Sequence, residues 1–325
     1  MSWMRAIPVT AAFLATVTCC AGAFAQDYPS KPIRFVVPFA PGGSTDIIAR
    51  SVGGKLTERW GQPVVIDNKP GAATTIGTDF VAKSPADGYT ILLTPAPFVI
   101  AQYAYPKLGY DSRRDFVPVS LLLKIPLVVA TNPQVIDARA LPAFVAALKA
   151  RPGKVDYGSP GNGSLSHLAV ELFRLQSGIE GNHVPYKGSA PVIVDLVAGR
   201  IGFTFTGPLE VQSHVKAGKL AVLAVALPNR LGYWPEIPTF REAGFPEYEA
   251  SFWFGVVAPA ATPRDLVEKL SNALAAAVKA PDVADKLVAL GAEIAGTTPE
   301  AYGQFLAAEH ARWSQAVKAA NVRIE

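Results

Sequence analysis

Short hydroxyl side chains lie in the glycine-rich turns of this sequence, an arrangement that can bind an anion without a buried arginine. The first half has Ser44, Thr45 and Thr74 in such turns, and the second half has Ser159 and Ser164. Because glycine has no Cβ, a ligand can approach the backbone of such a turn closely. A following helix N-terminus adds free amide donors and a partial positive charge. The pattern predicts a site for a small carboxylate.

Each of these hydroxyls can equally be an ordinary helix cap, so the argument for a binding site depends on how many of them there are.

The first turn follows an apolar run, residues 33–37, that predicts a strand. After the turn, a buried helix face is predicted by the four-residue spacing of Ile48, Val52 and Leu56. Either Ser44 or Thr45 can cap this helix.

Asp46 lies in the first turn of that predicted helix, where its charge suits the helix dipole. A bare carboxylate would nevertheless repel an incoming anion. We therefore interpret Asp46 as a residue that orders the turn, in preference to a ligand contact.

The second half of the chain repeats this device without repeating the sequence. A strand is predicted over 155–158, a turn over 159–163 and a helix over 164–176. His167 follows the predicted cap Ser164 by three residues, so it is either a base or a hydrogen-bonding partner that holds the turn. We favour the second reading. His183 lies beside a predicted strand, and we expect it to contact neighbouring residues or solvent.

The motifs of common enzyme classes are absent. The segment Tyr157–Gly161 has Tyr where a G-x-S-x-G elbow needs its first glycine. There is no phosphate-binding G-x-x-x-x-G-K-[ST] and no complete G-x-G-x-x-G. None of the four histidines forms an H-x-x-x-H or H-E-x-x-H pair. We expect no catalytic residues, no metal and no cofactor, although catalysis by residues distant in sequence stays open.

The first 25 residues have the pattern of a secretory signal peptide. Arg5 gives a positive start, an apolar run follows over residues 11–20, and residues 23–25 read Ala-Phe-Ala, which suits cleavage. Both cysteines of the chain, Cys19 and Cys20, fall inside this segment. A mature chain from about residue 26 would therefore have no thiol chemistry. We expect it to reach the periplasm, with no later membrane span.

Composition excludes nucleic acid as a partner. Removing the segment takes Arg5 from the 30 basic residues and leaves 29 against 26 acidic residues, a formal charge of +3. These charges are scattered, with no basic block or basic helix. With 325 residues, half of them apolar, the chain can form two domains.

Predicted strands alternate with predicted helices almost throughout, which is typical of an α/β fold with mainly parallel strands. The segment 95–115 is rich in Pro and Tyr and is predicted to be irregular. We expect two lobes, each a mainly parallel sheet flanked by helices. The first lobe would comprise residues 26–124 and 246–325, and the second residues 125–245. The chain would then cross between the lobes twice, near residues 124 and 246, and two such connections would permit hinge closure over a ligand.

Long stretches of the chain resemble the substrate-binding receptors of tripartite tricarboxylate transporters, the Bug family. The resemblance lies in PFAPGGSTDIIAR (38–50), DNKPGAATTIG (67–77), YGSPGNGSLSHLAVELF (157–173) and HVPYKGSAPVIVDLVAGRI (183–201), and it covers the mature chain in order. It implies a two-lobed periplasmic protein, usually a monomer, that closes on a small organic acid. It also implies membrane permease subunits as partners.

The resemblance further implies that amides and hydroxyls of facing loops hold the ligand carboxylate. In the first lobe these contacts would come from Ala40, Gly43, Ser44, Thr45, Ala73 and Thr74. In the second lobe they would come from Ser159, Gly161, Asn162 and Ser164, with Thr206 beside them.

Two departures from the family pattern bear on the ligand. Relatives often read G-A-G-G where this chain has Gly71–Thr74. The loop after Phe205 often carries an acidic residue that would suit a ligand ammonium group, and here it reads Thr206-Gly207-Pro208. The sequence therefore predicts a ligand without a cationic amine, such as a dicarboxylate, an aromatic acid or another simple carboxylate.

The leading hypothesis is a non-enzymatic receptor for uptake. The first alternative is a binding protein that presents its liganded form to a signalling partner, which would use the same residues. The second is a secreted enzyme that acts on a carboxylate.

Overall fold

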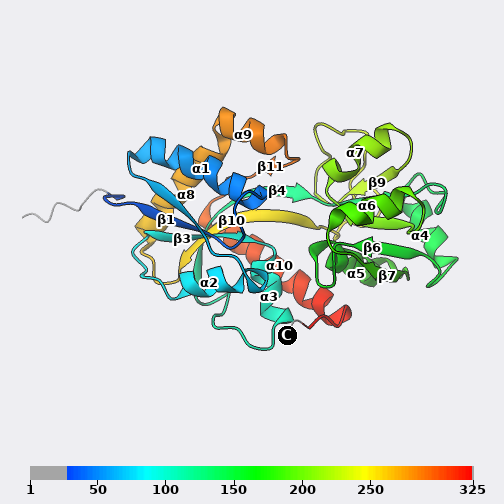
Figure 1. Ribbon diagram of the computed structural model, residues 1–325, viewed down its shortest axis with the longest axis horizontal. Helices are drawn as coiled ribbons and strands as arrows, with labels where there is room; N and C mark the ends of the chain where they lie inside the picture. Colours follow the sequence, from blue (N-terminus) through cyan, green and yellow to red (C-terminus); the bar gives the residue numbers. More distant parts are fainter. Residues whose placement is uncertain (1–27, 324–325) are drawn as a thin grey trace, which may run out of the picture.

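The computed structural model describes residues 28–323, so the predicted signal peptide lies outside the described residues. Figure 1 shows two lobes side by side along the long axis of the molecule, each built on one sheet. The fold is α/β, as predicted. Within the described residues, no helix combines the length and the apolar character needed to cross a bilayer.

The sheet of the first lobe has six strands in the order β11-β4-β10-β3-β1-β2. The strands are β1 (Ile33–Val37), β2 (Val64–Asn68), β3 (Thr90–Pro95), β4 (Phe116–Pro126), β10 (Ser251–Pro259) and β11 (Glu293–Ile294). The flanking helices are α1 (Ser44–Trp60), α2 (Thr75–Ala82), α3 (Pro97–Ala104), α8 (Arg264–Lys279), α9 (Pro281–Val288) and α10 (Pro299–Ala319), with a short 3₁₀ turn η1 (Ala72–Thr74). Ile48, Val52 and Leu56 are fully buried, which confirms the predicted face of α1.

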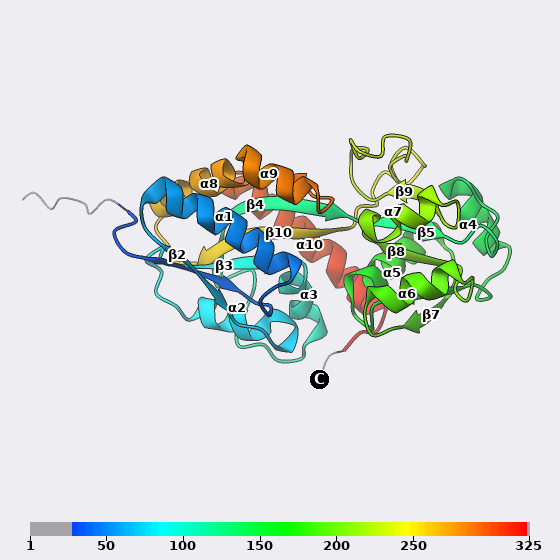
Figure 2. The same ribbon diagram turned by 45° about the horizontal axis from the view of Figure 1, so that its top comes forward.

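The sheet of the second lobe has five strands in the order β7-β6-β8-β5-β9. The strands are β5 (Val128–Thr131), β6 (Asp156–Ser159), β7 (Asn182–Pro185), β8 (Phe203–Thr206) and β9 (Ala221–Val225). The helices around it are α4 (Leu141–Lys149), α5 (Leu165–Ser177), α6 (Ser189–Val197) and α7 (Pro208–Lys216). Figure 2 shows these helices on both faces of the sheet.

Both sheets are mainly parallel in strand direction, as expected, with β10 and β11 reversed in the first sheet and β5 reversed in the second. β1 pairs in parallel with β2 and β3, and β6 pairs in parallel with β7 and β8. β10 is antiparallel to both of its long neighbours, β3 and β4, and β5 is antiparallel to β8 and β9. The reason is the connection between the lobes: β4 carries the chain towards the second lobe and β10 brings it back, so these neighbours run in opposite directions.

The segment 95–115 was expected to be irregular, and this expectation is wrong in its first half. Residues Pro97–Ala104 form α3, which begins with Pro97 in the first turn. Proline suits that position because the first turn has amide groups without helical partners. Phe98, Val99 and Ile100 are buried, so packing stabilises this short helix.

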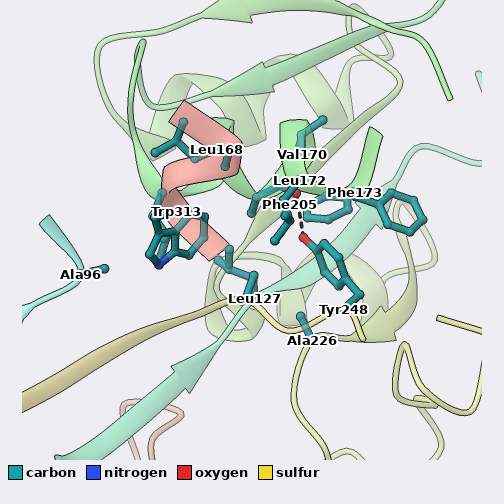
Figure 3. Packing of buried hydrophobic residues seen from close by; sticks show 14 of the residues in the cluster. Ala96, Leu127, Leu168, Val170, Leu172, Phe173, Phe205, Ala226, Tyr248 and Trp313 are labelled. Carbon is teal, nitrogen blue, oxygen red and sulfur yellow. Dashed lines mark hydrogen bonds between the residues drawn. The ribbon is translucent and has the colours of Figure 1, made fainter. Parts of the chain in front are cut away.

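The helix α10 joins the cores of the two lobes. Tyr302 in its first turn packs beside the first-lobe sheet, and its Oη lies 2.6 Å from Thr94 Oγ1. Near its other end, Trp313 packs in the same cluster as Leu168 of α5, as Figure 3 shows. On the second-lobe side of this cluster, Tyr248 Oη donates to the carbonyl oxygen of Ala169 at 2.8 Å.

A buried carboxylate lies in the middle of α10. Glu309 is 1% exposed and accepts a 2.6 Å hydrogen bond from the indole nitrogen of Trp253 and another from that of Trp313. Arg312 pairs with the same carboxylate. Burial raises the pKa of Glu309. Because Trp253 belongs to β10, this cluster ties α10 to a strand that connects the lobes.

Candidate ligand-binding site

The predicted first-lobe residues lie together at the carboxyl ends of two neighbouring parallel strands. Ala40, Gly43, Ser44 and Thr45 follow β1, while Ala73 and Thr74 form η1 beyond β2. Asn68, the last residue of β2, donates from its side-chain amide to the carbonyl oxygen of Phe39 at 3.0 Å. We call these two loops, residues 38–46 and 69–75, the first corner.

Asp46 holds the first corner together, as the sequence analysis expected. Its carboxylate accepts hydrogen bonds from Arg50 Nε at 2.8 Å, from the Gly42 amide at 3.0 Å and from the Asn68 side chain at 3.0 Å. The hydrogen bond from Arg50, followed by that from Gly42, lowers the pKa of Asp46 to about 2. A carboxylate with this many donors is ionised and satisfied, so it orders the turn.

The predicted cap of α1 is wrong. Gly43 occupies the N-cap position, with φ −81° and ψ 172°, and no side chain caps this helix end. Thr45 lies one residue inside the helix and is 8% exposed. Ser44 is the first helical residue, and the placement of its side chain lies outside the described part of the structure. None of the side chains that the structure describes accepts a hydrogen bond from the first-turn amides of α1.

The backbone of the first corner is strained at η1. Ala72, Ala73 and Thr74 have φ values of 44°, 47° and 82°. L-residues rarely adopt this region, and for a β-branched residue such as threonine it is a genuine outlier. The Thr74 hydroxyl is also sealed from solvent and has no hydrogen-bond partner in the described structure. Strain of this kind persists where the surrounding structure enforces it, often at ligand sites.

The predicted second-lobe residues also lie at one edge of a sheet. Ser159 ends β6, and Thr206 ends the neighbouring parallel strand β8. Gly161 and Asn162 form the turn that follows β6, and Gly161 has a φ of 149°, which favours glycine. Ser164 is the N-cap of α5 and accepts a hydrogen bond from the His167 amide at 3.3 Å, which confirms its predicted capping role. We call residues 159–164 with Thr206 the second corner.

Two stacked histidines support the second corner. The rings of His167 and His183 are nearly parallel, at 6°, with centroids 3.9 Å apart. His167 Nδ1 accepts a hydrogen bond from the Gly163 amide at 3.1 Å, so His167 holds the turn as we interpreted it. His183 Nε2 lies 2.7 Å from Ser159 Oγ, a contact that the sequence analysis missed.

Burial keeps both imidazoles neutral. Desolvation lowers the pKa of His167, and desolvation together with the nearby His167 lowers the pKa of His183 to about 4. Ser159 and His183 form the kind of pair that activates a nucleophile. However, Ser159 is fully buried, and Nδ1 of His183 has no hydrogen-bond partner among the described residues to orient it as a base. The contact is therefore suited to fixing a hydroxyl in one orientation.

Thr206 has an acidic neighbour that the sequence analysis did not consider. Its hydroxyl makes a short hydrogen bond to Glu210, which lies in the first turn of α7. Glu210 follows Thr206 by four residues, so the helix turn returns its carboxylate to the loop. Thr206 is buried and its hydroxyl is engaged with Glu210, as Ser159 is buried and engaged with His183, so both stay candidate contacts.

The two corners belong to different lobes. Among residues 28–323, no hydrogen bond or ion pair joins one corner to the other. In both Figures 1 and 2 the N-terminal end of α1 is turned towards the second lobe. The described residues also contain no group of three or more His, Cys, Asp or Glu side chains that could hold a metal ion. The charged residues of the first corner are already paired, Asp46 with Arg50 and Lys69 with Asp67. The candidate contacts of both corners are backbone amides and hydroxyls.

Comparison with known proteins decides the family. The chain matches the family model described as "Tripartite tricarboxylate transporter family receptor" over residues 48–322. The chain belongs to this receptor family. Protein BugT of Bordetella pertussis is 38% identical over 327 aligned positions, which cover all of both chains.

Two solved structures of similar receptors share the fold over nearly the whole chain. R. palustris Rpa4515, solved with adipate, is 35% identical with a TM-score of 0.71, and the match covers 91% of this chain and 99% of that one. A TctC solute-binding protein from Polaromonas, solved with no ligand, is 28% identical with a TM-score of 0.80, over 90% and 99% of the two chains. This receptor therefore has the fold of a periplasmic binding protein.

Proposed function

We propose that this receptor captures a small organic carboxylate between the first and second corners in the periplasm. It then delivers the acid to a membrane permease of the tripartite tricarboxylate type. The observation that carries the proposal is that each lobe presents amides and hydroxyls at the carboxyl ends of its parallel strands, next to a helix N-terminus. This is where α/β sheets bind ligands, and such helix ends attract anions.

Neutral donors suit a receptor that must release its cargo. A bidentate arginine–carboxylate pair is strong and specific, whereas amides and hydroxyls hold an acid less tightly. The candidate contacts are Ala40, Gly43, Ser44, Thr45, Ala73, Thr74, Ser159, Gly161, Asn162, Ser164 and Thr206. The domain division at residues 124–125 and 245–246 is part of this proposal, with closure about those crossings.

The ligand is proposed to be a carboxylate without an ammonium group. The adipate bound to Rpa4515 supports a dicarboxylate. The TM-score against the ligand-free Polaromonas protein, 0.80, is higher than that against adipate-bound Rpa4515, 0.71. The sequence identities run the other way, at 28% and 35%. This difference supports an open arrangement of the lobes that changes when ligand binds.

A solved relative that shares the fold is described as periplasmic binding protein BugD, which supports export through residues 1–25 and a periplasmic location. The proposed receptor is monomeric, carries no cofactor and catalyses no reaction. Its partners are the organic acid and the permease subunits.

A thermal-shift screen of the chain from residue 26 tests the proposal. The panel should contain aliphatic dicarboxylates, tricarboxylates, aromatic acids and amino acids. A ligand that binds only the folded state raises the melting temperature in proportion to the logarithm of its concentration. We expect one or more acids without an ammonium group to do so. Absence of stabilisation across the whole panel would contradict the receptor proposal, and stabilisation by amino acids alone would contradict the predicted ligand class.

The contact between Ser159 and His183 favours one alternative, a secreted enzyme that acts on a carboxylate. Turnover of any acid that binds, lost on Ser159→Ala or His183→Ala with the fold intact, would support that alternative. We expect the acid to be recovered unchanged from the wild-type protein as well as from the variants.

A further inference from the structure

A concavity lies in the first lobe, outside both corners. It is a cavity of ≈ 650 Å³ between α3, β4 and α10. None of its lining residues belongs to the first or second corner. Its volume lies within the range of about 300–1,000 Å³ that is typical of small-molecule sites. We call it the α10 cavity.

The wall of the α10 cavity is mainly apolar. Phe116 and Pro118 of β4, Val257 of β10 and Leu306 of α10 contribute side chains. Gly303 of α10 lines the same space, and a Cβ added there would meet only Pro118 Cγ within 4 Å, at 3.6 Å. The space beside this glycine is therefore open to the body of an apolar molecule.

A polar group with an unused hydrogen-bonding nitrogen lines the cavity. His310 is 7% exposed, and its Nδ1 lies 3.1 Å from Tyr103 Oη. In the described structure Nε2 has no hydrogen-bond partner, and it is not among the atoms sealed from solvent. Burial, followed by the charge of Arg113, lowers the pKa of His310 to about 4, so the ring is neutral at pH 7. When Tyr103 donates to Nδ1, Nε2 carries the proton and is a free donor.

Arg113 adds a positive charge to the lining. Its Nε lies 3.8 Å from the carboxylate of Asp111, whereas Arg114 approaches the same carboxylate to 3.1 Å. Asp111 also accepts a hydrogen bond from the Arg113 backbone amide at 2.8 Å. Because Arg114 and this amide already bind the carboxylate of Asp111, the guanidinium of Arg113 has N–H groups left to bind another anion.

We propose that the α10 cavity is a second binding site, for an amphipathic monocarboxylate. The hydrocarbon body would lie against Phe116, Val257 and Leu306, and the carboxylate would meet Arg113 and His310. This site is independent of the proposed site between the corners, because it shares no residue with it.

Octanoate is the probe, titrated by calorimetry into the chain from residue 26, with 1-octanol as the uncharged analogue. Gly303→Leu fills the cavity, and leucine also suits a helix better than glycine. Gly54→Leu is the matched control, because Gly54 is an exposed glycine of α1 with nothing within 4 Å of an added Cβ. We expect octanoate to bind the wild type and Gly54→Leu equally, and Gly303→Leu at least about tenfold more weakly.

Arg113→Ala tests the charge, and it keeps the proposal falsifiable if Gly303→Leu fails to fold. We expect it to weaken octanoate about tenfold and to leave 1-octanol unchanged within about twofold. The proposal is overturned if octanoate does not bind the wild type, or if it binds folded Gly303→Leu as tightly as Gly54→Leu. It is also overturned if Arg113→Ala weakens the alcohol as much as the acid.

Discussion

The side chains of Ser159 and His183, which belong to neighbouring parallel strands, meet at 2.7 Å between Oγ and Nε2. Ser159 Oγ also lies 3.0 Å from the Gly161 carbonyl oxygen and 3.2 Å from the Gly161 amide nitrogen. The hydroxyl is therefore fixed by three groups, and the turn of the second corner is fixed with it. The effect of substituting either residue on ligand affinity can therefore be predicted.

His183→Gln should weaken binding of the carboxylate found in the thermal-shift screen about three- to tenfold. The reason is that Ser159 loses its fixed orientation, a loss comparable to one hydrogen bond. Ser159→Ala should weaken it by about tenfold or more, because the side chain that fixes the Gly161 turn is removed altogether. Calorimetric titration measures both, with Ser213→Ala on the exposed face of α7 as control. Unchanged affinity in both corner variants would contradict the assigned role of the second corner.

The free energy of unfolding should fall as the pH drops from 7 to 5. The pKa values of His183 and His310 are lowered to about 4, and that of His167 is also lowered. Unfolded histidine titrates near pH 6.5. Between about pH 6.5 and 4 the unfolded chain therefore binds more protons, so stability is complete above this window and is lost as the pH falls through it.

Urea unfolding at pH 7, 6 and 5 measures this loss. His183→Gln removes one titrating group, so its stability should fall less than that of the wild type over the same interval. Equal stability of the wild type at pH 7 and pH 5 would contradict the neutral, buried state of the stacked rings.

Ala73→Gly should raise the free energy of unfolding by about 1 kcal/mol. Alanine at φ 47° costs about 1–2 kcal/mol, which exceeds the extra chain entropy that glycine loses on folding. Ala276→Gly on the exposed face of α8 is the matched control and should be destabilising. Urea denaturation compares the two. Destabilisation of the same size in both variants would mean that the first corner is not strained at this residue.

Glu309→Ala should destabilise the fold by about 3–5 kcal/mol. The substitution leaves the indole nitrogens of Trp253 and Trp313 buried without their acceptor. It also removes the nearer carboxylate from Arg312, which keeps only Glu249 at 3.8 Å. Glu268→Ala, which breaks a solvent-exposed pair with Arg264 on α8, should change stability little. Similar unfolding midpoints for the two variants would show that the Glu309 cluster does not hold α10 against β10.

Much of the architecture could be predicted because local signals and packing agree. The face of Ile48, Val52 and Leu56 follows from helical spacing, and the cap at Ser164 follows from a hydroxyl at a helix start. The helix at 97–104 was missed because the segment 95–115 is rich in proline and tyrosine, which are typical of loops, while burial of Phe98 and Ile100 stabilises the helix. The antiparallel return of β10 depends on the lobe connection, which no local pattern encodes.

The candidate site was predictable in its turns but not in its supporting contacts. Asp46 was interpreted correctly because a carboxylate in a first helical turn has an evident local role. His183 was not recognised because its contact with Ser159 depends on the register of β6 against β7. Glu210 was overlooked because only the loop residues 206–208 were considered. The four-residue spacing of Thr206 and Glu210 could have indicated their contact. The ligand contacts and the domain division stay predictions.

The central claim is that a carboxylate bridges the two corners and draws the lobes together. Its most direct test is the distance between spin labels at Ile76→Cys on α2 and Val194→Cys on α6, both exposed, in a mature chain that otherwise has no cysteine. Measured by pulsed electron–electron double resonance with the most stabilising acid from the screen, the distance should shorten and its distribution should narrow. Saturating binding of that acid with an unchanged distance distribution would contradict the account.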